Sequence, residues 1–153
     1  MHSVLVSLLF DAPAPRVWEL LREPGSVQAW HPAVLDSEAT ALGRDLVLTN
    51  GERIRERIDF IDDEHRAFGT TTFQSPMAFH RLQGTLRVWP QGPRRSLVEF
   101  CGFFEAAPET AAETLSLVRD FHLAGLGALR TKLAKDATAP VRIALPATLA
   151  AAG

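Results

Sequence analysis

The sequence has little cysteine, no long apolar run and almost no net charge. Its single cysteine, Cys101, excludes an internal disulfide framework and a cysteine-rich zinc site. No apolar run approaches the roughly 20 residues that span a bilayer, and the short apolar start has no basic residues before it ends at Asp11, so we expect no membrane span and no signal peptide. A net charge of −2 gives no electrostatic footprint for nucleic acid. These absences predict a cytoplasmic protein.

Several signatures of enzyme chemistry are also missing. The chain has no glycine-rich phosphate loop and no Gly-x-Ser-x-Gly elbow. Its five histidines form no His-x-Glu or His-x-x-x-His pair, so we expect no metal and no cofactor.

The composition that remains is that of one globular domain. Hydrophobic residues make up 46% and charged residues 22% of the 153 residues, close to the soluble average. We place the domain at residues 1–136, followed by an Ala- and Pro-rich tail at 137–153. The tail is too apolar for a purely solvated end, and we expect it to pack on the domain or on a second copy of the chain.

The first third of the chain predicts a strand followed by two short helices. Residues 3–10 are apolar and partly β-branched, which is typical of a strand. Pro13 and Pro15 can begin a helix, which ends before Pro24. A second short helix is expected from Ser26 to Trp30.

The middle and the end of the chain predict a sheet and one long helix. Between residues 33 and 105 apolar residues alternate with polar ones, as on the segment 52–60, which puts Ile54, Glu56, Ile58 and Phe60 on one face. Strands are expected at 34–40, 44–49, 52–60, 66–74, 80–89 and 95–105. From about 108 to 135, apolar residues spaced by three and four form a helical stripe.

This order predicts an α+β fold with a curved antiparallel sheet of six to seven strands wrapped around the C-terminal helix. A sheet with one apolar face must cover that face, and the long helix is the only element able to do so. One helix cannot fill so curved a sheet, so a cavity is expected between them.

Short motifs along the chain strengthen this interpretation. They are Ala12–Leu21, Trp30–Val34 with Ser37-Glu38, Asn50-Gly51 before Ile54–Glu56, Asp62-Asp63 before Arg66, Gln74–Pro76, Gly84–Val88 and Phe121–Leu126. Together they resemble the START/Bet v1-like (SRPBCC) superfamily and, within it, the polyketide cyclase/dehydrase and lipid-transport family. The resemblance implies the helix-grip fold and a ligand-binding domain, with relatives that are cyclases, ligand carriers and hormone receptors. It also implies that Glu56 points inward.

Three polar residues are candidates for chemistry in the expected cavity. Glu56 lies on the apolar face of its strand, His80 shares a face with Leu82, and His122 lies in the helical stripe. An inward carboxylate needs a partner or a wet cavity, so Glu56 is either a cavity acid or base or a carboxylate tied to an arginine. Glu56, His80 and His122 together could form a proton-transfer set, although a lone histidine on an apolar face is more often structural.

Strand parity and the helical stripe predict the lining of the cavity. The expected lining residues are Trp30, Ile54, Glu56, Thr71, Phe73, His80, Leu82, Phe100, Phe104, His122 and Leu126. His31 is expected to end the second short helix.

Three functions remain open on the sequence. The first, which we favour because the inward residues are mostly apolar, is binding of a small hydrophobic molecule, with an aromatic or polyketide-like ligand as one option. The second is a cyclase or dehydrase that uses the same cavity for acid–base chemistry. The third is an assembly protein, such as a homodimer, that uses the outer sheet face or the apolar tail.

Overall fold

The computed structural model describes residues 1–138, so the predicted tail from residue 139 onward lies outside the described residues. The elements in chain order are β1 (His2–Phe10), α1 (Ala14–Leu21), the 3-10 helix η1 (Pro24–Ser26), α2 (Val27–Trp30), β2 (Val34–Ala39), β3 (Gly43–Leu48), β4 (Arg53–Asp62), β5 (Ala67–Gln74), β6 (Leu82–Pro90), β7 (Ser96–Phe104) and α3 (Ala111–Thr138).

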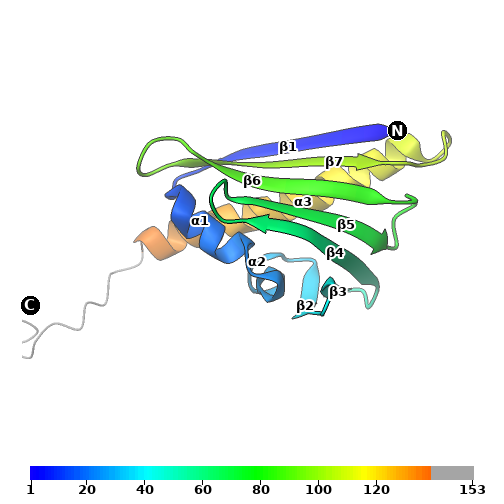
Figure 1. Ribbon diagram of the computed structural model, residues 1–153, viewed down its shortest axis with the longest axis horizontal. Coiled ribbons are helices and arrows are strands. Elements are labelled where there is room, and N and C mark those ends of the chain that lie inside the picture. The colour runs from blue at the N-terminus through cyan, green and yellow to red at the C-terminus, as the bar shows by residue number, and fades with distance from the viewer. Residues whose placement is uncertain (139–153) are drawn as a thin grey trace, which may run out of the picture.

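The seven strands form one antiparallel sheet in the order β1-β7-β6-β5-β4-β3-β2. On β7, Val98, Phe100 and Phe104 are at most 3% exposed, whereas Phe103 between them is 46% exposed. This alternation gives the sheet a buried inner face and an outer face. In Figure 1 the strands form a curved layer and α3 runs behind them. The predicted α+β helix-grip architecture is confirmed.

The long helix α3 covers the inner face with a continuous apolar stripe. Val118, Leu126, Leu129 and Leu133 recur at helical spacing and are at most 2% exposed. They share one core with inward residues of β1 and β7. Because burying each such side chain contributes about 1.5–3 kcal/mol, this stripe holds the helix against the sheet.

The strand β4 departs from simple alternation. Its register with β5 shifts between Arg55 and Glu56 and again between Ile58 and Phe60, and such bulges insert a residue that turns the following side chains to the other face. The prediction that Phe60 shares the inner face was therefore wrong. The Phe60 ring is 45% exposed and lies where a Cβ on Gly69 would be, against the outer face of β5.

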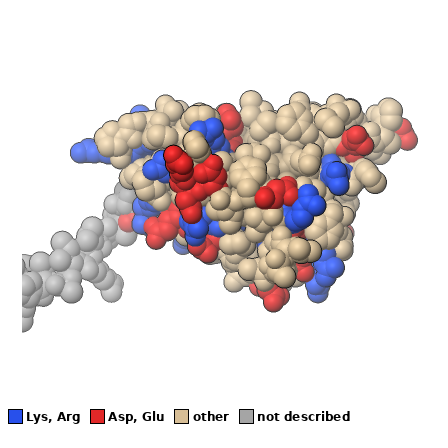
Figure 2. Space-filling view, in the orientation of Figure 1, with Lys and Arg blue, Asp and Glu red and all other residues tan. Residues whose placement is uncertain are grey.

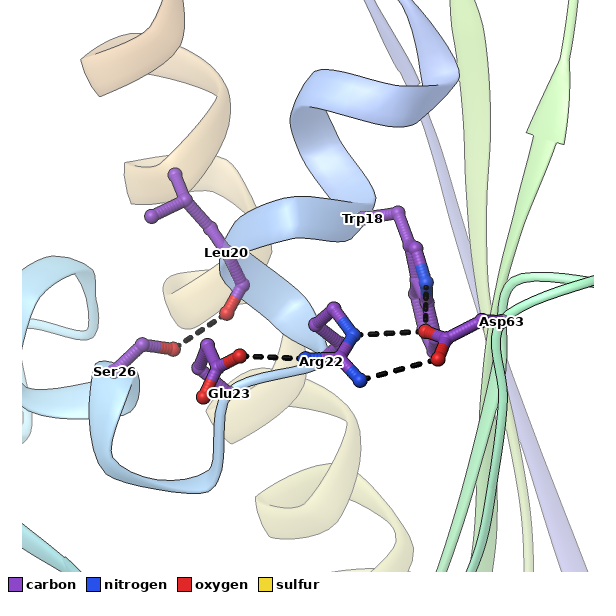
Figure 3. A network of polar contacts seen from close by, with 6 residues as sticks. All are labelled: Trp18, Leu20, Arg22, Glu23, Ser26 and Asp63. Carbon is purple, nitrogen blue, oxygen red and sulfur yellow. Dashed lines mark hydrogen bonds and ion pairs between the residues drawn. The ribbon is translucent and has the colours of Figure 1, made fainter.

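Helix α1 is fixed to the β4–β5 turn by a polar cluster (Figure 3). Asp63 accepts a hydrogen bond from Trp18 Nε1 at 2.9 Å and two from Arg22, at 2.7 Å from Nε and 3.1 Å from Nη2. The hydrogen bonds from Arg22 and Trp18 lower the pKa of Asp63. Ser26 Oγ then donates to the Leu20 carbonyl at 2.6 Å, which closes the turn after the helix. This cluster fixes the start of the segment that carries α2 over the cavity.

Candidate functional site

Two small chambers lie between the inner face of the sheet and α3. Measured as the volume open to the centre of a water molecule, the larger holds about 40 Å³ and the smaller about 20 Å³. Since one water needs roughly 10–15 Å³ by this measure, the unliganded cavity has room for a few waters. Glu56, Phe121 and His122 line both chambers, so these three side chains form the boundary between them.

A buried ion pair joins β3 to β4 at this boundary. Arg44 Nε donates to Glu56 Oε2 at 2.7 Å, and the two side chains are 11% and 13% exposed. Thr72 Oγ1 donates to the other carboxylate oxygen at 3.3 Å, and the Arg44 guanidinium lies 5.2 Å from the centre of the Phe68 ring. Within residues 1–138 neither Nη atom of Arg44 forms a hydrogen bond, so the pair keeps free donors beside the larger chamber that Arg44 lines.

His122 presents a free nitrogen to the same space. Its Nδ1 lies 2.8 Å from the Val118 carbonyl, and because a carbonyl only accepts, Nδ1 carries the proton. Burial lowers the pKa of His122 to about 4, although the bond to Val118 and the nearby Glu56 carboxylate act in the opposite direction. At neutral pH the ring is therefore uncharged, and Nε2, which has no partner among the described residues, is a hydrogen-bond acceptor.

Phe100 and two glycines hold the His122 ring in place. The two rings stack with centroids 3.6 Å apart and an angle of 11° between their planes. A Cβ on Gly84 would lie 2.6 Å from the Phe100 ring, and one on Gly102 would lie 3.0 Å from it. Because these two positions are glycines, the Phe100 ring can lie flat on the sheet. The ring in turn supports His122.

His31 joins α2 to α3 beside the larger chamber. The side chain is 4% exposed; its Nε2 donates to the Phe121 carbonyl at 2.9 Å, and its Nδ1 accepts from Ala33 N–H at 3.1 Å. Burial lowers the pKa of His31, while the bond to Phe121 opposes that shift. The ring occupies the space where a Cβ on Gly125 would lie. His31 thus ends α2, as expected, and holds it on α3.

The structure brings many of the predicted lining residues together. Trp30 and Leu126 line the larger chamber, Ile54 and Leu82 line the smaller one, and Glu56 and His122 line both. Phe100 and Phe104 are buried in the core next to these chambers without lining either.

Thr71 and Phe73 lie on the other face of β5, in contrast to the parity expected for them. Phe68, 1% exposed, fixes which side of β5 is buried, and alternation from Phe68 turns Thr72 inward. Thr71 instead donates to Asp59 at 2.7 Å, and Phe73 is 58% exposed. Because Phe68 and Phe73 are an odd number of residues apart, they cannot share a face of the strand. The predicted lining placed Phe73 on the inner face, whereas the structure places Phe68 there.

His80 lies outside the cavity as well. The strand β6 begins only at Leu82, so the alternation does not extend back to His80. Its backbone N–H donates to the Glu105 carbonyl at 2.8 Å, and its exposed side chain lines a separate open groove beside Arg81 and Phe103. The predicted proton-transfer set is therefore reduced to Glu56 and His122.

Among the lining residues that the sequence reasoning missed, three matter most for the site. Arg44 shares its strand face with Leu46 and Leu48, which could have indicated that it points inward. Thr72 was missed because parity was counted from the wrong aromatic residue. Phe121 lies beside the helical stripe, and only the packing of α2 against α3 shows that it lines the cavity.

Within residues 1–138 no group of three or more His, Cys, Asp or Glu side chains is placed to hold a metal ion. Among the helices of this part of the chain, none is long and apolar enough to cross a membrane.

Comparison with solved structures finds the same architecture in several proteins. An uncharacterised protein from Bacillus thuringiensis superposes with a TM-score of 0.81 at 26% identity, covering 86% of this chain and 98% of the other. The Zhui aromatase/cyclase from Streptomyces sp. R1128 gives a TM-score of 0.78 at 20% identity and covers 93% and 99% of the two chains. Norcoclaurine synthase from Thalictrum flavum gives 0.71 at 18% identity, covering 90% and 96%. At these last two identities the likeness concerns the fold alone.

Comparison at the level of sequence assigns the family. No curated protein matches the chain significantly. A family model, described as polyketide cyclase / dehydrase and lipid transport, matches residues 1–134, which include every side chain that lines the two chambers. The chain belongs to the polyketide cyclase / dehydrase and lipid transport family.

Proposed function

We propose that the protein binds a small hydrophobic molecule that carries an oxygen group, in the cavity between the sheet and α3. The observation that carries this proposal is the meeting of Arg44, Glu56 and His122 at the boundary of two otherwise mostly apolar chambers. Ligand sites of this kind combine an apolar lining with a few polar groups that fix orientation. The family includes proteins of lipid transport as well as cyclases, and an aromatic or polyketide-like skeleton fits this lining.

Each polar residue has a distinct role in this proposal. The free Nη donors of Arg44 bind a carbonyl or hydroxyl oxygen of the ligand, and His122 Nε2 accepts a hydrogen bond from a ligand hydroxyl. Glu56 is a positioning residue, because its bond to Nε holds the guanidinium in one orientation. Since the chambers have room for only a few waters, the Phe121 ring moves aside when a larger ligand fills both.

The test measures binding of two matched probes, 2-naphthol and naphthalene, to the full chain by NMR titration. We expect 2-naphthol to bind at least tenfold more tightly than naphthalene. Arg44→Met should remove that preference while the chain stays folded, as judged by circular dichroism. Arg57→Met is the matched control, because Arg57 lies on the outer face and pairs with Asp59 at 2.7 Å.

Two results would contradict the proposal. One is that neither probe binds and that native mass spectrometry of the chain purified from its own host shows no bound small molecule. The other is that Arg44→Met and Arg57→Met have equal effects. Glu56→Gln tests whether Glu56 positions Arg44 for the ligand or only stabilises the fold. If the variant is folded and binds 2-naphthol as tightly as the wild type does, Glu56 is not part of the site.

A cyclase or dehydrase activity is the second candidate, and the free Nε2 of His122 is the observation that favours it. Nε2 would take a proton from a carbon next to a ligand carbonyl, and the electron pair of the broken C–H bond would move to the oxygen, held by Arg44. The resulting enolate carbon would then bond to a second carbonyl carbon of the same molecule, the π electrons of that carbonyl would move to its oxygen, and this oxygen would take the proton back from His122 Nε2. However, a base works best with a pKa near the working pH, and that of His122 is about 4, which is why we place binding first.

Deuterium exchange distinguishes the two candidates. The methyl protons of acetophenone exchange slowly in neutral D2O, and NMR follows their loss. An enzyme accelerates the exchange, and His122→Phe abolishes the acceleration. A chain that binds acetophenone without accelerating its exchange is a carrier.

A further inference from the structure

The outer face of β1, β7 and β6 carries few charged residues. The strand registers place Leu5 beside Cys101, Leu9 beside Leu97, and Leu97 beside Trp89. Leu5 is 62% exposed, Leu9 61%, Phe103 46% and Trp89 36%. The band along these strands at the top of Figure 2 is correspondingly mostly uncharged. Antiparallel sheets with a solvated outer face normally carry polar residues there, and large exposed apolar areas mark interaction sites.

Two opposite charges lie side by side in the middle of this face, and no ion pair between them is formed within the described residues. Arg87 and Glu99 are directly opposed across β6 and β7. The Arg87 guanidinium lies 3.5 Å over the centre of the Trp89 ring, and its Nε has no hydrogen-bond partner within the described chain. Among the side chains that the structure describes, neither Arg87 nor Glu99 forms an ion pair. The face therefore offers one cation and one anion at adjacent positions, and neither has an ion-pair partner in the described chain.

We propose that this face is the interface between two copies of the chain. The copies are related by a two-fold axis that runs parallel to the strands, above the outer face and over the line between β6 and β7. Such an axis exchanges the positions of opposed residues on the two strands. It places Arg87 over the partner's Glu99 and, by symmetry, Glu99 under the partner's Arg87. One rotation thus gives both charges an ion-pair partner, which is the self-complementarity that an isologous interface requires.

The same rotation brings apolar residues together. Leu97 meets the partner's Trp89, and Leu5 on the edge strand meets the partner's Phe60, whose ring covers Gly69 in the same row of the sheet. The strands of the two sheets run nearly parallel to the axis, which is the aligned geometry of packed sheets. Arginine, tryptophan and phenylalanine are the residue types that dominate interface energetics.

The size of the face places this dimer at the small end of specific interfaces. With β5 included, because the Phe60 ring lies over it, four strands about 4.8 Å apart and eight or nine residues long at about 3.3 Å per residue cover roughly 550 Å² per copy. Specific stable interfaces bury about 800 Å² per partner. An interface at this small end of the size range is expected to be weak, so the population of the dimer depends on protein concentration. This inference is independent of the proposed ligand and its cavity, which lies on the opposite face of the sheet.

A charge exchange tests the pairing. Sedimentation velocity of the full chain from about 1 to 200 µM should show a reversible dimer with a micromolar Kd. Arg87→Glu and Glu99→Arg each place like charges together across the interface, and each should raise Kd at least tenfold. The double variant Arg87→Glu/Glu99→Arg restores opposite charges and should return Kd to within threefold of the wild type. Arg53→Glu, an equal change of charge at an exposed site on β4, should leave Kd unchanged.

Three results would overturn the proposal. A wild-type chain that is monomeric over the whole range has no such interface. A dimer whose Kd the single reversals leave unchanged associates through another surface. Single reversals that dissociate the dimer without rescue in the double variant exclude the proposed two-fold axis. Melting curves for each variant confirm that a loss of dimer does not come from unfolding.

Discussion

Two glycines in α3, two residues apart, should respond in opposite ways to substitution by alanine. At Gly127 an added Cβ meets nothing within 4 Å, whereas at Gly125 it meets the His31 ring, with Nε2 at 2.8 Å. Alanine in a helix interior is favoured over glycine by about 0.5–1 kcal/mol. Gly127→Ala should therefore raise the free energy of unfolding by that amount.

Gly125→Ala gains the same helix propensity but displaces His31. The displaced ring loses its bonds to the Phe121 carbonyl and to Ala33 N–H, at about 1 kcal/mol each. It also loses its packing on the Phe121 ring, whose centroid is 4.2 Å away, which contributes about 1 kcal/mol. The losses sum to about 3 kcal/mol, so the net effect is a destabilisation of about 2 kcal/mol.

Thermal and urea unfolding measure both changes. For a domain of this size about 1 kcal/mol shifts Tm by 2–4 °C, so Gly127→Ala should melt a few degrees above the wild type and Gly125→Ala about 4–8 °C below it. In a His31→Ala background the obstruction is gone, and adding Gly125→Ala should then be stabilising. If Gly125→Ala is as stable as the wild type, or remains destabilising without His31, the role assigned to His31 is refuted.

Three further predictions concern titration, the α1 cluster and the Phe100 platform. His122 has a pKa of about 4 in the folded chain, against about 6.5 when unfolded. As pH falls, the unfolded chain therefore takes up the proton first. The free energy of unfolding should then fall by up to about 3 kcal/mol as pH drops from 6.5 to 4. Urea titrations of His122→Phe should show a shallower fall, and an unchanged slope would contradict the buried neutral ring. Asp63→Asn should lower Tm at pH 7 by weakening the bonds from Arg22. About 1 M salt should narrow the Tm difference from wild type, because salt screens the exposed ion pair, and a difference that salt leaves unchanged would contradict the role of charge. Gly84→Ala places a Cβ 2.6 Å from the Phe100 ring and should cost about 1–3 kcal/mol; equal stability in urea would mean that the ring has room to move.

The architecture could be predicted because each of its elements is encoded locally. Alternation on β7 and the stripe from Val118 to Leu133 both follow from residues close in sequence, and the structure confirms them. Pro24 and the His31-Pro32 pair predicted the ends of the two short helices to within a few residues of where the structure has them. The family resemblance rests on these same local motifs.

The candidate site was only partly predictable, because it depends on registers that no local pattern contains. The bulges in β4 turned Phe60 outward, and the choice between Phe68 and Phe73 as the buried aromatic of β5 decided that Thr72, rather than Thr71, points inward. Whether Glu56 was a free cavity acid or a paired carboxylate also stayed open until Arg44 was found beside it.

The fold class, the order of the elements and the inward position of Glu56 and His122 follow from local sequence patterns, since hydrophobic periodicity acts over a few residues at a time. Which polar groups meet depends instead on how the folded chain packs. Arg44 and Glu56 come together because β3 and β4 pair in one register, and His122 keeps a free nitrogen because Val118 engages the other one while Phe100 supports the ring. His80 lies outside the site because β6 begins only at Leu82, so the alternation of the strand does not reach back to it. Contacts of this kind depend on the packing of segments that are distant in sequence, where one residue of register changes which side chain faces the cavity.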